Sequence, residues 1–288
     1  MRILITGAFG QLGYALRSVL SKNSYYELIC TGRRIKEGQG GISLDIRNQV
    51  ALKEIINTTA PDIVINLAAM TNVDACELNP KLAGEVNVAG LQHICDSFSG
   101  KIIHLSTDYV FDGRSGPYKE NDRLNPISTY GKTKLLSEQI LLESDINNLV
   151  IRGNVLYDYS SDTKASFLNW VVLSLQNNEE IQVVEDQFNN PTWTRSMADI
   201  IDLSITNNLD GIIHWGDADY ISRYDFAIMI AKKFSLNKDL IKPILTSELN
   251  QPANRPLQSG LKTEKLVSIL DIIPPSIDEC LDEIIKTF

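Results

Sequence analysis

The sequence has few cysteines and histidines and no long apolar run, and each shortage excludes a class of protein. Its four cysteines are widely spaced without a CxxC pair, so we interpret them as reduced core thiols rather than a disulfide framework. The three histidines show no ligand-like spacing, and no metal site is predicted. No apolar stretch approaches the roughly 18 residues of a membrane span, and no signal-like segment precedes the first apolar run. We therefore expect a cytoplasmic protein without a membrane partner.

Positive charge is also scarce. The chain of 288 residues carries 27 basic and 36 acidic side chains, a net charge of -9. Proteins that grip nucleic acid usually present a basic surface, so no nucleic-acid partner is expected. With 43% apolar and 22% charged residues, the composition suits a globular chain of one large or two modest domains.

Short apolar runs alternate with helical patterns in the first half. The runs predict strands at 2–6, 27–31, 42–44, 62–66, 101–106 and 148–152, and the patterns predict helices at 11–21, 47–58, 81–98 and 128–144. The runs are apolar throughout, which is typical of a parallel sheet covered on both faces. Residues 1–152 are thus predicted to form an α/β, doubly wound parallel sheet of the Rossmann type that binds NAD(P).

The second half is less regular. Helices are expected at 165–177, 195–206, 222–234, 262–270 and 276–286, with a loop or strand edge at 185–193. We interpret residues 153–288 as a smaller C-terminal substrate cap, of which parts such as 195–215 pack back on the first domain.

A glycine triplet follows the first strand. TGAFGQLG places Gly7, Gly10 and Gly13 at GxxGxxG spacing, between a strand and a helix, which is the context that dinucleotide binding requires. Glycines permit a tight turn, close approach to a pyrophosphate and close packing of the helix. The helix N-terminus then offers N–H groups and positive charge to the phosphates.

The end of the second strand bears on the choice of dinucleotide. NAD sites commonly carry an acidic residue there, whereas this chain has Arg33 and Arg34. Two guanidinium groups suit a 2′-phosphate, so NADP(H) is favoured over NAD(H). The alternative is that the two arginines form a solvated basic turn that binds no phosphate. Asp45 and Ile46 are expected near the adenine.

A Tyr-x-x-x-Lys pair opens the helix after the fifth strand. Tyr130 and Lys134 share one helix face, so that the ammonium is expected to lower the pKa of the phenol and to hold the nicotinamide ribose. Tyr130 could then exchange a proton with a carbonyl oxygen. Thr107, at the end of the fifth strand, could hydrogen-bond the same oxygen. Asp108 is a candidate for either substrate binding or capping.

These motifs resemble the dTDP-4-dehydrorhamnose reductase family, within the extended short-chain dehydrogenases/reductases. The resemblance covers nearly the whole chain and rests on TGAFGQLG, NLAAMTNVDACE, STDYVFDG, NPISTYGKTKLLSE, VVEDQFNNPTW and RPLQSGLKTEKL. It implies NAD(P)H-dependent reduction of the C4 ketone of a nucleotide-linked 6-deoxy sugar, in a family that inclines to homodimers. Tyr130 would supply the proton, and Thr107 would tune it and bind the sugar.

The resemblance also implies roles for individual residues. The cofactor would contact Gly10, Gln11, Leu12, Asp45, Ile46, Leu67, Ala68, Ala69 and Leu105. The sugar and its nucleotide would contact Thr71, Val73, Gln187 and Arg255.

The chain departs from the family after the sixth strand. The common Arg-Thr-Ser-Trp-Val-Tyr is replaced by RGNVLY at 152–157. Val155 takes the place of the tryptophan, which removes a flat apolar wall from the sugar site.

Two other functions share these motifs. The β subunit of methionine adenosyltransferase, a regulatory binding subunit, has a similar Tyr-Lys motif and lacks the Thr-Ser-Trp run. A nucleotide-sugar epimerase would use the same chemistry with retained NAD, which the arginine pair and the short chain disfavour.

Overall fold

A single parallel sheet organises the larger part of the molecule. The computed structural model describes residues 1–159 and 166–287. Seven strands lie in the order β11-β6-β5-β4-β1-β2-β3, and every neighbouring pair is parallel. The strands are β1 (Arg2–Thr6), β2 (Glu27–Gly32), β3 (Ile42–Ser43), β4 (Ile63–Asn66), β5 (Lys101–Thr107), β6 (Asn148–Gly153) and β11 (Gly211–Trp215). The predicted doubly wound α/β sheet is confirmed.

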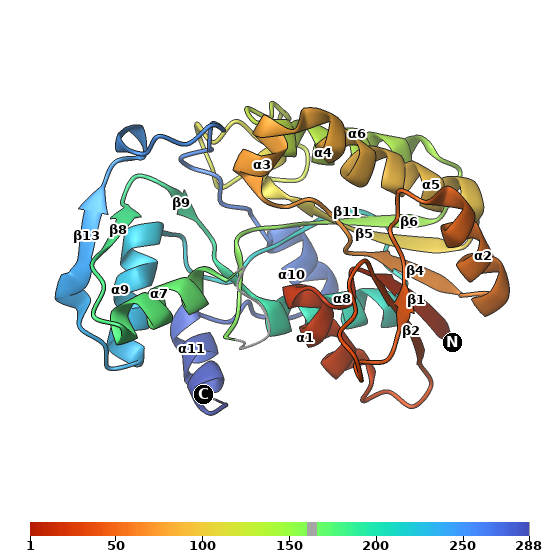
Figure 1. Cartoon of the computed structure of the whole chain (residues 1–288), viewed down its shortest axis with the longest axis horizontal. Coiled ribbons are helices and arrows are strands. Elements are labelled where there is room, and N and C mark those ends of the chain that lie inside the picture. The colour runs from red at the N-terminus through yellow and green to blue at the C-terminus, as the bar shows by residue number, and fades with distance from the viewer. Residues whose placement is uncertain (160–165, 288) are drawn as a thin grey trace.

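Helices cover both faces of this sheet, as Figure 1 shows. One layer contains α2 (Gln49–Thr59), α3 (Val73–Leu78), α4 (Pro80–Gly84), α5 (Gly90–Ser97) and α6 (Thr129–Glu143). The other contains α1 (Gln11–Leu20), α8 (Thr194–Thr206) and α10 (Glu264–Leu270). A π-helical turn, Glu85–Ala89, joins α4 to α5, so that the helix expected at 81–98 forms in three parts.

The covering of both sheet faces explains why β1 is apolar throughout. Ile3 and Ile5 pack in one buried cluster with residues of α1 and α8. Leu4, between them, points to the opposite face and packs in a second cluster with residues of α2 and α5. Because successive strand residues face opposite sides, a sheet covered twice needs an apolar residue at every position.

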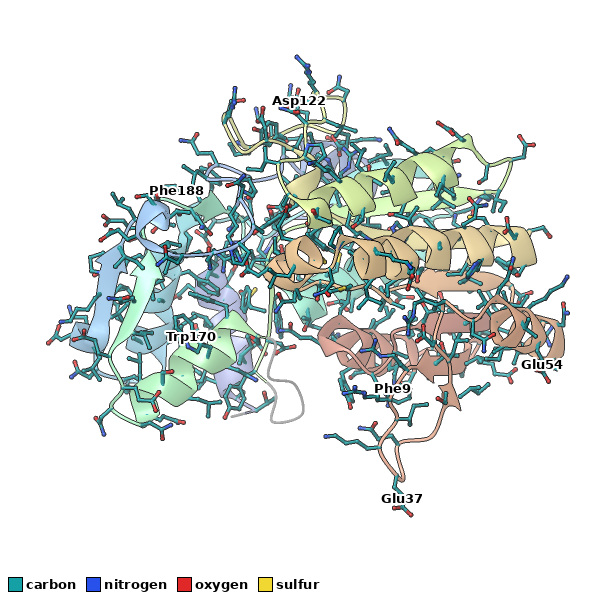
Figure 2. The ribbon with its side chains drawn as sticks, turned by 45° about the horizontal axis from the view of Figure 1, so that its top comes forward. Phe9, Glu37, Glu54, Asp122, Trp170 and Phe188 are labelled. Atoms are coloured by element: carbon teal, nitrogen blue, oxygen red, sulfur yellow. The ribbon has the colours of Figure 1, made fainter. Side chains whose placement is uncertain are left out.

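A smaller lobe has its own apolar core. It contains α7 (Phe167–Gln176), α9 (Arg223–Lys233), α11 (Ile277–Ile285) and the parallel pair β8 (Ile181–Val184) and β13 (Ile241–Ile244). Two further strand pairs are β7 (Leu156–Tyr157) with β10 (Thr192–Trp193), and β9 (Phe188–Asn189) with β12 (Ile221–Ser222). Figure 2 shows Trp170 on α7 and Phe188 on β9, both in this lobe.

The structure adds elements that the sequence patterns did not indicate. The short strands β8, β11 and β13 and the helix α3 fall where no strand or helix was expected. β11 pairs with β6 and completes the main sheet, while α8 packs on α1. Residues 194–215 therefore belong structurally with the sheet, and the division at 152/153 stays a prediction. Residue 165, the expected start of a helix, lies outside the described residues.

None of the described helices is both long enough and apolar enough to span a membrane.

Candidate functional site

A crevice of about 600 Å³ opens at the carboxyl ends of the strands. It runs past the neighbouring ends of β1 and β4, where the strand order reverses, and such a switch point is where doubly wound sheets bind ligands. Most of the predicted site residues line it: Gly7, Gly10, Gln11, Leu12, Gly13, Arg33, Asp45, Ile46, Leu67, Ala68, Ala69, Leu105, Thr71, Val73, Thr107, Asp108 and Tyr130. The structure thus brings together segments that span more than one hundred residues of sequence.

The glycine loop gives one end of the crevice the character of an anion site. Gly10 is the N-cap of α1, with no side-chain cap and no acidic residue in the first turn, so the helix N–H groups are available to a ligand. The buried amide nitrogen Nε2 of Gln11 also has no hydrogen-bond partner among the described residues. At Gly13 a Cβ atom would lie 2.5 Å from the carbonyl carbon of Ala8, so only glycine lets α1 start this close to the loop. These features fit a pyrophosphate.

The end of β2 supplies one of the two predicted arginines. Arg33 is exposed and lines the crevice, whereas Arg34 does not line it. The loop after them projects from the molecule, with Glu37 at its tip in Figure 2. Asp45 forms an ion pair with Arg47 at 2.6 Å, and that guanidinium lowers the pKa of the Asp45 carboxyl. This end can therefore receive a phosphate at Arg33.

The start of α6 holds Tyr130 against the strand ends. The hydroxyl of Ser128 accepts a hydrogen bond from the N–H of Gly131 at 3.2 Å and caps the helix. A Cβ atom at Gly131 would lie 2.2 Å from the carbonyl oxygen of Tyr109, so glycine allows the helix to touch the segment that follows β5. The ring of Tyr130 packs edge-on against that of Tyr109, with centroids 5.6 Å apart.

The pKa of Tyr130 differs from the expectation. Burial raises it well above the usual value, and the hydrogen bond with Thr107 opposes this only in part. The predicted lowering by the Lys134 ammonium is wrong for this structure, because the desolvation of the phenolate is the dominant effect. The phenol is therefore protonated at neutral pH, and the raised pKa makes it a weaker acid than a free tyrosine.

Lys134 is buried beneath the crevice, where its ammonium contacts a backbone carbonyl and an imidazole ring. Its Nζ donates to the carbonyl oxygen of Leu105 at 2.7 Å and lies 3.0 Å from Nε2 of His104. Burial lowers the pKa of Lys134 to about 8. Burial also lowers the pKa of His104 far below its usual value, so the ring is neutral, and its Nδ1 lies 3.0 Å from Nδ2 of Asn66. His104 is thus a hydrogen-bonded core residue.

A buried ion pair fixes the strands behind the site. Arg152 on β6 and Glu138 on α6 meet at 2.7 Å, and both side chains are 1% exposed. Ser106 on β5 donates to Glu138, and Nη1 of Arg152 lies 3.3 Å from Nε2 of His214 on β11. This network ties three neighbouring strands and α6 together. Removing one charge of such a pair costs about 3–5 kcal/mol.

The opposite end of the crevice is lined by Thr71, Val73 and Asp108, together with Arg223 from the start of α9. Burial raises the pKa of Asp108 to about 6, although the neighbouring hydroxyl groups of Ser259 and Thr107 oppose the shift. Arg223 donates from Nε to Oε1 of Gln187 at 3.1 Å. This end thus contains both an acid and a guanidinium.

Two predicted nucleotide-binding residues do not line the crevice. Gln187 lies behind Arg223 and donates to Thr246 at 3.0 Å. Arg255 lines a neighbouring cavity of about 670 Å³ and forms an ion pair with Asp74 at 2.6 Å. Their predicted contact with a nucleotide stays a prediction.

Several residues of the crevice were not singled out as site residues. They are Thr31, Gly32, Leu44, Met70, Leu82, Val86, Ser106, Tyr109, Gly153, Asn154, Val155, Leu156 and Arg223. Asn154 directly follows a strand, as Asp108 does, and this position was an available signal. Arg223 carries no such signal, because only the packing of the smaller lobe brings α9 to the crevice.

The fold and the site together define a Rossmann-type protein of the extended short-chain dehydrogenase/reductase class. The family model described as the RmlD substrate binding domain matches residues 1–288, and the chain belongs to this family.

Relatives and solved structures agree with this assignment. The chain is 33% identical to a dTDP-4-dehydrorhamnose reductase of Aggregatibacter actinomycetemcomitans, over 98% of each protein. The solved dTDP-4-dehydrorhamnose reductase of Bacillus anthracis in complex with NADP is 28% identical, with a TM-score of 0.91 over 100% of this chain and 99% of that one. The chain is also 30% identical to the methionine adenosyltransferase 2 subunit beta of Bos taurus, over 93% of this chain and 82% of that protein.

Proposed function

We propose that the protein is a reductase that uses NAD(P)H to reduce the C4 ketone of a nucleotide-linked 4-keto-6-deoxy sugar. The substrate we propose is dTDP-4-dehydrorhamnose, which would become dTDP-rhamnose for cell-surface polysaccharide. The observation that carries this is the single crevice in which Tyr130 and Thr107 face the same space as the glycine loop. The reductases among the relatives support the same reading.

The chain's own residues account for the proton in this reaction. When bound, the reduced nicotinamide supplies the hydride. Tyr130, protonated at neutral pH, gives its proton to the ketone oxygen, and Thr107 lines the crevice beside it. Lys134, fixed on the carbonyl of Leu105, would hold the nicotinamide ribose, which is the role that the Tyr-Lys spacing predicts.

The cofactor would lie along the predicted residues from Gly7 to Leu105, with its pyrophosphate on the N-terminus of α1. We propose NADP(H) as the preferred form, because Arg33 lines the crevice at the end of β2, the position where NAD sites commonly carry an acidic residue. The complex of the Bacillus anthracis reductase with NADP supports this choice.

The test follows the absorbance of NADPH at 340 nm with dTDP-4-dehydrorhamnose generated in situ. We expect oxidation that depends on the sugar and yields dTDP-rhamnose, identified by chromatography against the standard. A reaction without the sugar serves as the control. Sugar-independent oxidation, or none at all, would contradict the proposal.

A second candidate is a regulatory binding subunit. It is favoured by the relatives named methionine adenosyltransferase 2 subunit beta, which are 30% identical to this chain, and by the absence of an aromatic wall at Val155. Such a protein would bind NADPH without turnover and would co-purify with an enzyme partner. The same assay, combined with a cofactor-binding titration, separates the two functions.

A further inference from the structure

The register of the sheet places two polar side chains next to each other at the sugar end. Thr107 on β5 pairs with Gly153 on β6, so the residues that follow, Asp108 and Asn154, leave neighbouring strands at the same level. Both side chains line the crevice, and the two residues are only 2% and 4% exposed. A parallel sheet therefore delivers both groups to one point.

Each of these side chains retains one oxygen without a partner. The hydroxyl of Thr107 donates to Oδ1 of Asp108 at 3.0 Å. The other oxygen, Oδ2, accepts no hydrogen bond of normal geometry from the described residues. The hydroxyl of Ser259 lies near enough to lower the pKa of the Asp108 carboxyl. Asn154 donates from Nδ2 to Oδ1 of Asn190 at 3.3 Å, and its own Oδ1 has no partner within the described part of the chain. Both orphaned atoms are acceptors.

Buried acceptors without donors are uncommon, because each costs about 1–3 kcal/mol. Two of them at one end of a ligand crevice indicate a ligand that brings two donors. Arg223 lies close enough to lower the pKa of Asp108, but it donates from Nε to Gln187, and no hydrogen bond from it to either orphaned atom is present among the described residues.

We propose that Asp108 Oδ2 and Asn154 Oδ1 accept hydrogen bonds from the hydroxyl groups on C3 and C2 of the keto sugar, and that Asn154 is therefore a specificity-determining residue. This rests on the proposed function. Asp108 takes the hydroxyl next to the ketone, because it adjoins Thr107, which lines the crevice together with Tyr130. Asn154, on the next strand, takes the following hydroxyl. The crevice thus selects fully hydroxylated sugars over 2-deoxy and 3-deoxy sugars.

The experiment is a double-mutant cycle between Asn154 and the 2-hydroxyl. Asn154→Leu removes the acceptor at similar volume, and Oδ1 of Asn190 keeps its hydrogen bond from the N–H of Leu261 at 2.8 Å. kcat/KM is measured for dTDP-4-dehydrorhamnose and its 2-deoxy analogue with both enzymes. We expect the wild type to prefer the hydroxylated sugar by at least about tenfold. In Asn154→Leu this preference should fall to within about twofold, with little change toward the analogue.

The control is Asn189→Leu, which removes another buried asparagine that does not line the crevice. It should leave the preference at the wild-type value. If Asn154→Leu unfolds, Asn154→Ala replaces it, with the melting temperature as the check. A preference that survives in a folded Asn154 variant overturns the inference.

A binding version of the cycle separates this inference from the proposed function. The dissociation constants of dTDP-rhamnose and its 2-deoxy counterpart are measured by calorimetry with NADP⁺ present. Absence of turnover by the wild type contradicts the reductase function, whereas coupling between Asn154 and the 2-hydroxyl in binding still supports the subsite. Equal affinity of the wild type for both sugars, or no affinity, overturns the subsite.

Discussion

The two ends of the crevice are built in different ways. The dinucleotide end is made of backbone and one continuous segment, the loop from Gly7 to Gly13, with the neighbouring ends of β2 and β4. The sugar end is assembled from side chains of β5, β6, α6 and α9, which lie far apart in the chain. The first end depends on close packing around the loop, so a change at a tightly packed position such as Gly13 affects the fold. The second end presents individual side chains, so one substitution can alter specificity while the sheet persists.

The strongest test of this contrast is Tyr130→Phe, a change at the sugar end alone. Without the phenol proton, kcat should fall by about 10²–10⁴-fold. NADPH affinity should remain within about twofold, because the loop and Arg33 are untouched. Stopped-flow turnover and fluorescence titration measure the two quantities. Retained turnover would remove Tyr130 from the mechanism, and lost NADPH binding would mean that the two ends are not separable.

A pair of glycine substitutions tests whether the dinucleotide end is fixed by packing. Gly13→Ala forces a Cβ to within 2.5 Å of the Ala8 carbonyl carbon, so we expect a loss of about 1–3 kcal/mol in the free energy of unfolding. Gly10→Ala meets nothing nearer than 3.4 Å, and its φ of -85° suits alanine. It should keep the wild-type stability and weaken NADPH binding by about tenfold.

Thermal and urea denaturation give the stabilities of these two variants, and titration gives the affinities. Equal destabilisation by both substitutions would show that Gly10 serves the fold rather than the ligand.

Arg33→Ala tests the choice of cofactor. Losing a charge-assisted hydrogen bond to a phosphate costs about 1.5–3 kcal/mol, so the Kd for NADPH should rise by at least about tenfold and that for NADH by less than threefold. Arg34→Ala is the matched control, because Arg34 does not line the crevice. If Arg33→Ala and Arg34→Ala raise the Kd for NADPH relative to that for NADH by the same factor, the arginines act only through their net charge.

The smallest expected effect is a difference in pH limits between sugar turnover and NADPH binding. The pKa of Asp108 is raised to about 6, so below this pH the carboxyl gains a proton and kcat/KM for the sugar should fall by up to tenfold per unit. The pKa of Lys134 is lowered to about 8, so above this pH the ammonium is lost and NADPH affinity should fall severalfold. Kinetics and titrations from pH 5 to 9.5 measure both. In Asp108→Asn the fall in kcat/KM below about pH 6 should disappear. If that fall persists, it is due to another titrating group.

Much of the fold could be predicted from the sequence, because its strong signals are local. Continuous apolar runs and helical patterns predicted six strands of the main sheet, and TGAFGQLG predicted the turn into α1. β11 was missed because five residues, GIIHW, carry too little periodicity to distinguish a strand. It becomes a strand by pairing with β6, a contact across about sixty residues.

The same distinction between local sequence signals and tertiary contacts applies to the candidate site. The sequence by itself determined the glycine loop, the Tyr-Lys spacing and the polar residues after β5, since each depends on neighbours within a few residues. Only the tertiary structure decided that burial raises the pKa of Tyr130, that Lys134 rests on Leu105, and that Asn154 stands beside Asp108. Desolvation and strand register are properties of groups brought together from distant positions, and no local pattern contains them.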